Sequence, residues 1–157
     1  MIRFERARLA DAKALAYVSW RAFDNDVFYG APRTGGPPGY RSAQWQARIM
    51  KLGTYYKILS DHQVIGGLIV FDKGQGHYEL GRVFLDPDYQ NQGIGGRAIQ
   101  FLEQAFPQAR RWTLGTPRWN LRTQHFYEKM GYTRVGEDGP EGWLYEKTVT
   151  SQAEPGQ

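Results

Sequence analysis

The sequence predicts one α+β domain, in which about four helices flank a central mixed, mostly antiparallel β-sheet of about seven strands. Its 157 residues, 41% of them hydrophobic, suffice for a single compact domain but not for two. The apolar pattern gives the order β α α β β β α β α β β. Three consecutive strands in the middle exclude a purely parallel doubly wound sheet, which needs a helix between neighbouring strands.

The first third of the chain predicts one strand and two helices. Residues 2–8 alternate apolar and charged side chains, as a half-buried strand does. Asp11 is a candidate N-cap for the first helix. Proline and glycine interrupt residues 29–39, which we therefore expect to form a loop before a second helix over about 40–51.

The middle of the chain predicts an antiparallel meander. Residues 54–60 and 64–73 are rich in β-forming side chains and flank a three-residue connection. A glycine-containing turn leads to a third strand over 77–85, which Pro87 prevents from continuing.

The last third predicts alternating helices and strands. A glycine-rich segment opens a helix that runs to about Phe106. The remaining elements are a strand over 111–115, a helix over 120–130, and a final strand pair over 133–135 and 143–149. We expect one domain over 1–149 and a flexible C-terminal tail over 150–157.

Composition excludes several classes of protein. The chain has no cysteine, which removes disulfides, thiolate metal sites and cysteine nucleophiles. Its three histidines lack metal-binding spacing, so we expect no metal. The longest apolar stretch, 64–71, is too short to span a membrane, and the charged N-terminus predicts no signal peptide. A cytoplasmic location is the expectation.

Positive charge is concentrated in the first 60 residues. These hold 10 Lys/Arg and 4 Asp/Glu, a net of +6, whereas residues 61–157 hold 10 and 12, a net of −2. A solvated basic face explains this pattern, and so does a surface for a polyanion such as a phosphate-rich cofactor or nucleic acid.

The most informative segment is LDPDYQNQGIGGRA, residues 85–98. Glycines at a helix start leave backbone N–H groups uncovered, and the helix dipole adds positive potential, so the turn suits a phosphate. A flexible turn with glycines for positive φ is the alternative. The chain has no Walker A sequence. Gly93-x-Gly95-x-x-Ala98 matches a dinucleotide fingerprint only loosely, without the expected strand before it or acid after it.

Two motifs together resemble a known family. Gln90-x-x-Gly93-x-Gly95 resembles the acetyl-CoA signature of the GCN5-related N-acetyltransferase (GNAT) family. The segment NLRTQHFYEKMGY, residues 120–132, is similar to the second signature of that family, Asn-x5-Phe-Tyr-x3-Gly-Phe/Tyr. The motifs lie in the order and at the separation usual in the family, and the predicted elements match its fold over about 1–149.

The resemblance implies a set of acetyl-CoA-binding residues. Backbone amides in and around the glycine turn would hold the pyrophosphate, the end of the preceding strand would face the pantetheine arm, and Gln90 and Arg97 could add side-chain contacts. Asn120 would bond the pantetheine or cap its helix, or do both. The residues so implied are Val83, Phe84, Leu85, Gln90, Asn91, Gln92, Gly93, Ile94, Gly95, Gly96, Arg97, Asn120 and Tyr127.

Acetyl transfer to an amine needs a base for the ammonium proton and an acid for the departing thiolate. Tyr127 occupies the motif tyrosine and is the candidate acid, although a core aromatic is the alternative. Glu79 lies 11 residues before Gln90 and is the candidate base; strict alternation places it on one face with Gly81, Val83 and Leu85. Pairing with a nearby cation, or simple exposure, would also explain Glu79. His125 is the rival base.

The expected activity is direct acetyl transfer from acetyl-CoA to a primary amine, because no cysteine is present to carry an acetyl group. We favour a small-molecule amine over a peptide or protein N-terminus or lysine, since no additional recognition domain is present. Aromatic and acidic side chains of the first two helices, their connection and the last hairpin suit a cationic amine. A non-catalytic acyl-CoA-binding module on the same fold is an alternative. A nucleic-acid-binding protein would leave both motifs unexplained. The resemblance also implies a possible homodimer, which is common in that family.

Overall fold

The computed structural model describes residues 1–150, so almost all of the predicted tail lies outside the described residues. Seven strands and four α-helices form in the predicted order, together with three short 3₁₀ helices. The strands are β1 Ile2–Arg6, β2 Thr54–Ser60, β3 Gln63–Gly74, β4 His77–Leu85, β5 Arg111–Pro117, β6 Thr133–Glu137 and β7 Gly142–Thr148. The helices are α1 Ala12–Asp24, α2 Ala43–Leu52, α3 Ile94–Ala105, α4 Leu121–Lys129, η1 Leu9–Asp11, η2 Asn25–Tyr29 and η3 Pro87–Tyr89.

The seven strands form one sheet in the order β1-β2-β3-β4-β5-β7-β6. Every pair is antiparallel except β4 with β5, which run parallel because α3 carries the chain back along the sheet between them. The predicted mixed, mostly antiparallel sheet is confirmed.

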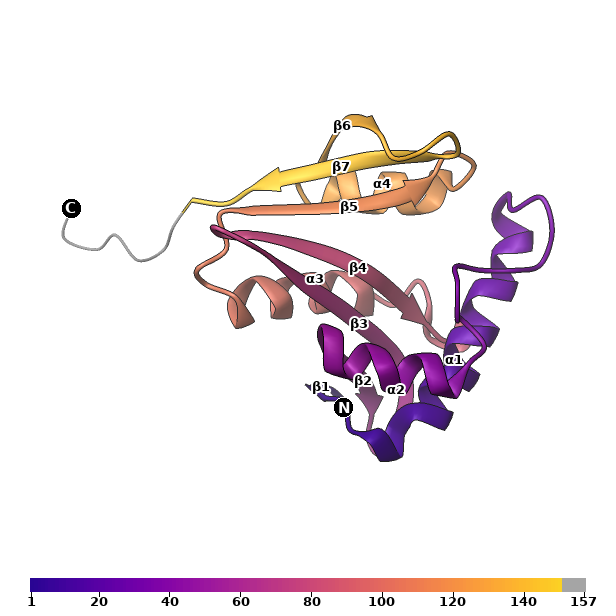
Figure 1. Ribbon diagram of the computed structural model, residues 1–157. Coiled ribbons are helices and arrows are strands. Elements are labelled where there is room, and N and C mark those ends of the chain that lie inside the picture. Colours follow the sequence, from indigo (N-terminus) through magenta and orange to yellow (C-terminus); the bar gives the residue numbers. More distant parts are fainter. Residues whose placement is uncertain (151–157) are drawn as a thin grey trace.

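Helices cover the sheet unequally. On one face α1 and α2 pack on β2, β3 and β4 (Figure 1), around buried side chains that include Leu15 and Ile69. On the other face α3 and α4 enclose a larger core with Ile99, Trp112 and Tyr145 at its centre. Burial of these apolar side chains is the main source of the stability of the fold.

Some boundaries differ from the prediction. Helix α2 begins at Ala43 rather than near Tyr40, because the Ser42 hydroxyl caps it by accepting a bond from the Trp45 amide at 3.0 Å. The 3₁₀ helix η2, which extends α1, was not predicted. None of the helices among residues 1–150 has the length and apolar character needed to cross a membrane.

Candidate active site

The sheet opens between β4 and β5. The two strands pair only from His77 with Arg111 to Glu79 with Thr113, after which β5 continues alongside β7 while β4 diverges from it (Figure 1). We call this opening, between residues 80–85 of β4 and 114–117 of β5, the fork. Within residues 1–150 this edge of β4 has no further strand partner, so its backbone groups can bond another molecule, apart from the Leu85 carbonyl oxygen, which accepts a bond from Gln90.

A β-bulge in β4 accompanies the opening. Ile69 of β3 pairs with Arg82, but Val70 pairs with Leu80, so Gly81 is an extra residue in β4. A Cβ at Gly81 would lie 2.5 Å from the ring of Phe71, which packs over it. The bulge bends β4 where it leaves β5.

The bulge corrects the predicted orientation of Glu79. Residues directly opposite one another share a face of the sheet. Glu79 is opposite Phe71, and Arg82 is opposite Ile69, so Glu79 shares the α1–α2 face with Arg82. Gly81 lies on the same face as Glu79, since a Cβ there would meet the Phe71 ring. The prediction that Val83 and Leu85 share this face is wrong, because the inserted residue reverses the alternation after it.

Glu79 lies at the base of the fork. Its side chain is 41% exposed, and its Oε1 lies 3.8 Å from Lys73 Nζ. A half-exposed pair at this distance contributes little to stability and leaves the carboxylate accessible. Beside it, His77 Nε2 and Thr113 Oγ1 are 2.7 Å apart and form a hydrogen bond that links β4 to β5 within the short stretch where the two strands pair. The rival base His125 is exposed on α4.

The glycine turn follows β4 and is firmly held. Asp86 accepts a bond from the Asp88 amide at 2.9 Å. Arg21 of α1 donates to both oxygens of the Asp86 carboxylate, from Nε at 3.0 Å and from Nη2 at 3.2 Å. Asn91 and Gly93 adopt positive φ of 63° and 80°. These conformations reverse the chain into α3.

Helix α3 begins with open N–H groups. Gly93 is its N-cap and provides no side-chain bond, so the first amides of the helix, those of Ile94, Gly95 and Gly96, have no intrahelical partner. Asn91, Gln92, Gly93 and Arg97 are exposed around them. This cluster of donors at a helix N-terminus can hold an anionic group. The structure brings the predicted pyrophosphate-binding residues together.

Gly95 and Gly96 also serve packing. A Cβ at Gly95 would lie 3.2 Å from the ring of Phe126, and one at Gly96 would lie 3.8 Å from Met130 Sδ. At position 95 a side chain would thus press on α4, so that glycine has a structural reason beside its open amide.

Gln90 is engaged within the protein. Its Nε2 donates to the Leu85 carbonyl oxygen at 3.0 Å, and its Oε1 accepts a bond from Arg122 at 2.8 Å. These bonds fix the segment between β4 and the glycine turn. Val83 and Leu85 face the α3–α4 core, whereas Phe84 is buried against α1.

Tyr127 is buried on α4 between Phe126 and Tyr132. Burial raises the pKa of its phenol above the ordinary value, so the group stays protonated at neutral pH. Asn120 caps α4, accepting a bond from the Thr123 amide at 3.2 Å, which confirms the capping role. The hydroxyls of Thr123 and Thr116 lie 2.7 Å apart and join α4 to β5.

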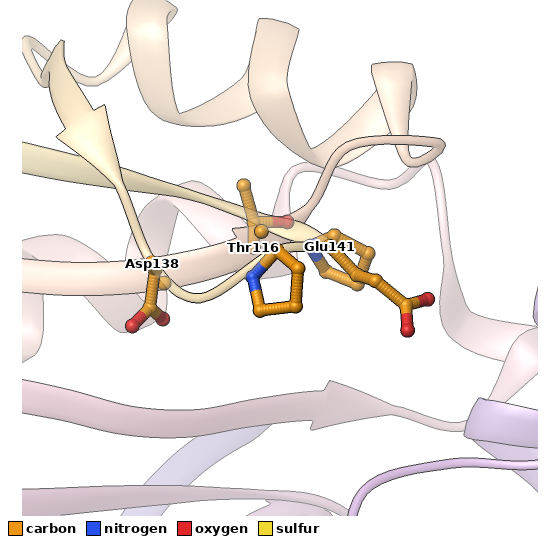
Figure 2. A pocket seen from close by; sticks show the side chains of 7 residues that line it. Thr116, Asp138 and Glu141 are labelled. Carbon is orange, nitrogen blue, oxygen red and sulfur yellow. The ribbon is translucent and has the colours of Figure 1, made fainter.

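A pocket of about 340 Å³ lies where β5 ends and the β6–β7 loop turns. Figure 2 shows the carboxylates of Asp138 and Glu141 projecting from the two ends of that loop, with Thr116 between them. The Asp138 carboxylate lies directly over Gly115, where any Cβ would collide with it. The pocket is lined by Gly115, Thr116, Pro117, Asp138, Pro140, Glu141 and Gly142.

Two arginines were missed by sequence reasoning. Arg21 holds the glycine turn through Asp86, and Arg122 links α4 to Gln90. No motif marks either residue, because both partners come from distant parts of the chain. Among residues 1–150 no group of three or more His, Asp or Glu side chains is placed to hold a metal ion.

Comparison with known proteins assigns the family. Residues 13–132, which include the glycine turn and α4, match the model of the Acetyltransferase (GNAT) family. The chain belongs to the GNAT family. A stretch of 79 residues is 34% identical to YrkN of Bacillus subtilis (strain 168); it spans 49% of this chain but only 43% of that relative.

Solved structures share the fold of this GNAT protein. The PaiA N-acetyltransferase of Thermoplasma acidophilum, solved in complex with coenzyme A, superposes with a TM-score of 0.81 at 18% identity over 95% of this chain and 99% of that one. The ribosomal-protein-S18-alanine N-acetyltransferase of Escherichia coli gives 0.75 at 15% identity over 100% and 99%. At such identities the likeness establishes the fold.

Proposed function

We propose that this GNAT protein is an N-acetyltransferase that moves an acetyl group directly from acetyl-CoA to a primary amine. The observation that carries the proposal is the fork, with the open N–H groups of the glycine turn at one end and the Glu79 carboxylate at its base. Coenzyme A or acetyl-CoA is bound in structural relatives, including that from Thermoplasma acidophilum and one from Elizabethkingia anophelis. The chain has no cysteine that could carry the acetyl group.

In this proposal the pyrophosphate lies at the N-terminus of α3. The amides of Gly93 to Gly96 donate to it, and the dipole of a 12-residue helix favours its charge. The pantetheine arm then follows the unpaired edge of β4 over residues 83–85. Gln90 fixes the segment before the turn rather than contacting the cofactor with its side chain, because both polar atoms of that side chain are already bonded within the protein.

The chemistry divides three tasks among Glu79, a backbone N–H of β4 and Tyr127. Glu79, directly or through one water, takes a proton from the ammonium group, and the free amine attacks the thioester carbonyl. A backbone N–H of the unpaired β4 edge stabilises the oxyanion of the tetrahedral intermediate. When the C–S bond breaks, the attacking nitrogen loses its second proton to solvent as the amide forms. The Tyr127 phenol gives its proton to the thiolate and is reprotonated from solvent.

The acceptor we favour is a small cationic amine. The pocket beside β5 carries the carboxylates of Asp138 and Glu141, which attract an ammonium group, and its volume suits a small molecule. A protein N-terminus is the second candidate, since similar folds belong to acetyltransferases of the ribosomal-protein alanines of S18 and S5. We further propose a cytoplasmic location.

A screen of amines with acetyl-CoA, read as free thiol released, tests the activity and identifies the acceptor. It should include diamines, amino acids, aminoglycosides and short peptides. Activity with small amines but not peptides supports the favoured class. No thiol release with any amine, despite measurable acetyl-CoA binding, would favour a non-catalytic acyl-CoA-binding module.

A matched pair of variants tests the cofactor site. Nothing lies within 4 Å of where a Cβ at Gly93 would be, and Asn and Asp tolerate its positive φ about equally. Gly93→Asp adds a negative charge at the helix N-terminus, which repels phosphate yet does not weaken the helix. We expect acetyl-CoA affinity to fall at least about tenfold relative to Gly93→Asn in calorimetry. Equal affinities would remove the pyrophosphate from this turn.

A further inference from the structure

A single guanidinium joins the acceptor side of the molecule to the cofactor side. Arg122, on the first turn of α4, donates through Nη1 to Gln90 Oε1 at 2.8 Å and through Nη2 to Asp26 Oδ1 at 3.1 Å. Its guanidinium carbon also lies 3.6 Å from the ring centroid of Tyr29. We call these four residues the Arg122 bridge.

The bridge holds residues 25–30 across the far end of the fork. This segment continues α1, yet Asp26 and Tyr29 contact α4, and a Cβ at Gly30 would lie 3.1 Å from the carbonyl oxygen of Trp119 in the β5–α4 loop. The segment therefore connects the helical layer beside β4 with the loop that follows β5. It also presents Phe28, which is 80% exposed, to solvent.

On its other side the bridge reaches the cofactor site. Gln90 receives Arg122 through its oxygen and donates through its nitrogen to Leu85, the last residue of β4. Three residues after Gln90 the glycine turn caps α3. A continuous chain of contacts therefore runs from the glycine turn through Gln90 and Arg122 to the segment 25–30.

Stability does not explain why a carboxylate occupies position 26. The Asp26 side chain is only 14% exposed, and burial raises its pKa to about 6 even though Arg122 opposes that rise. Keeping such a group charged at neutral pH costs folding free energy. The other charges of α1 nearby in sequence are engaged elsewhere, Arg21 with Asp86 and Asp24 with Trp20 and Tyr40.

We infer that Arg122 is a positioning residue that couples occupancy of the glycine turn to the order of segment 25–30. This segment adjoins the proposed acceptor pocket, because Gly30 approaches Trp119, two residues after Pro117 of that pocket. Coenzyme A bound at the turn would hold this segment in the arrangement that receives the amine, and linkage requires that the amine in turn strengthen coenzyme A binding. The inference rests on the proposed binding of coenzyme A at the turn.

Hydrogen exchange with coenzyme A as the probe tests the coupling without knowledge of the acceptor. In the wild type, saturating coenzyme A should slow amide exchange in a peptide covering 90–97 and in one covering 25–31. Arg122→Gln should keep the first effect and lose the second. Arg6→Gln is the matched control, because Arg6 also stacks on a tyrosine, Tyr56, but lies on the edge strand β1.

The outcomes separate the bridge from the cofactor site. Protection of 25–31 that is equal in wild type and Arg122→Gln, or protection of 90–97 alone in the wild type, overturns the bridge and leaves the proposed function intact. Failure of coenzyme A to protect 90–97 overturns both. If Arg122→Gln does not fold, Asp26→Ala removes the acceptor of the same contact and is read in the same way.

Steady-state kinetics add a second readout once an amine substrate is in hand. Loss of one charge-assisted contact should raise the amine KM in Arg122→Gln about tenfold, with kcat and acetyl-CoA affinity changed less than about threefold. Arg122→Lys should rescue the KM only in part, because one ammonium group cannot reproduce the two guanidinium N–H groups that bond Asp26 and Gln90 at the same time. An unchanged KM contradicts the inference, and so does a fall confined to kcat.

Discussion

The two halves of the sheet are built differently. One half is formed by β1 to β4. In its strand β3, the six consecutive residues 65–70 are buried, because helices cover both faces of the sheet there. In the half formed by β5, β7 and β6, only Tyr145 of β7 is buried and no residue of β6 is, while α4 lies over one face. The other face carries Gly115, Leu144 and Glu146, and no helix within residues 1–150 packs on it to a comparable extent.

This difference in burial suggests that one half of the sheet mainly stabilises the fold, whereas the other mainly provides a binding surface. The two-sided half supplies a rigid frame, and its last strand, β4, positions Glu79 and the glycine turn. The one-sided half contributes a surface rather than a core, and with β4 it forms the fork. Substitutions in the two halves should therefore affect different measurements, and the following predictions test whether they do.

The largest effect should come from Tyr127→Phe. The substitution keeps the ring that packs against Phe126 and Tyr132 but removes the hydroxyl proposed to protonate the thiolate. We expect kcat to fall about 10²–10⁴-fold with little change in acetyl-CoA affinity or in the unfolding midpoint. Thiol-release kinetics and thermal unfolding measure the two. A fully active variant would assign the proton to another group.

Leucines in the two halves should differ in their contribution to stability. Leu68→Ala empties a site on β3 that is 0% exposed and should lower the free energy of unfolding by about 2–5 kcal/mol. Leu144→Ala alters a half-buried side chain on the uncovered face of β7 and should cost about 1 kcal/mol. If both variants lost the same free energy of unfolding in urea, the two halves would contribute equally to the hydrophobic core.

Glu79→Gln should lower the rate about 10²-fold near neutral pH, because the amide cannot accept the ammonium proton. The deficit should shrink as pH rises, since free amine then becomes abundant in solution. The pH profiles of kcat/KM for wild type and variant decide this. A deficit that is the same at every pH would make Glu79 a positioning group and move the search for a base to His125.

The smallest effect is a pH-dependent gain in stability from Asp26→Asn. The folded pKa of Asp26, about 6, lies above the ordinary value of 3.8, so in wild type this group favours folding fully only below 3.8 and loses that contribution as pH rises through about 6. The variant should therefore gain stability relative to wild type between pH 5 and pH 7. We expect about 1 kcal/mol in urea unfolding, which is the change in proton-binding free energy between these two pH values for a pKa raised from 3.8 to about 6. A relative loss over that range would contradict the assigned burial.

Local patterns were enough to predict most of the fold. Alternation and turn residues predicted all seven strands, and the glycines predicted the open amides at the start of α3, because these signals reside in neighbouring residues. The reversal at Glu79 was missed although a lone glycine inside a strand, Gly81, is a recognised sign of a bulge. The Arg122 bridge has no local signal at all, because 96 residues separate Arg122 from Asp26.

The uncovered face of β5 and β7 has a consequence for how this protein can change over evolutionary time. Most substitutions are removed by selection because they lower stability below a threshold. A face that carries little of the core escapes much of that constraint, so residues such as Glu146 and Asp138 can vary at small cost in folding. The frame of β1 to β4 would stay fixed while new acceptors are explored on the other half, and one scaffold could thereby give rise to lineages with different substrates.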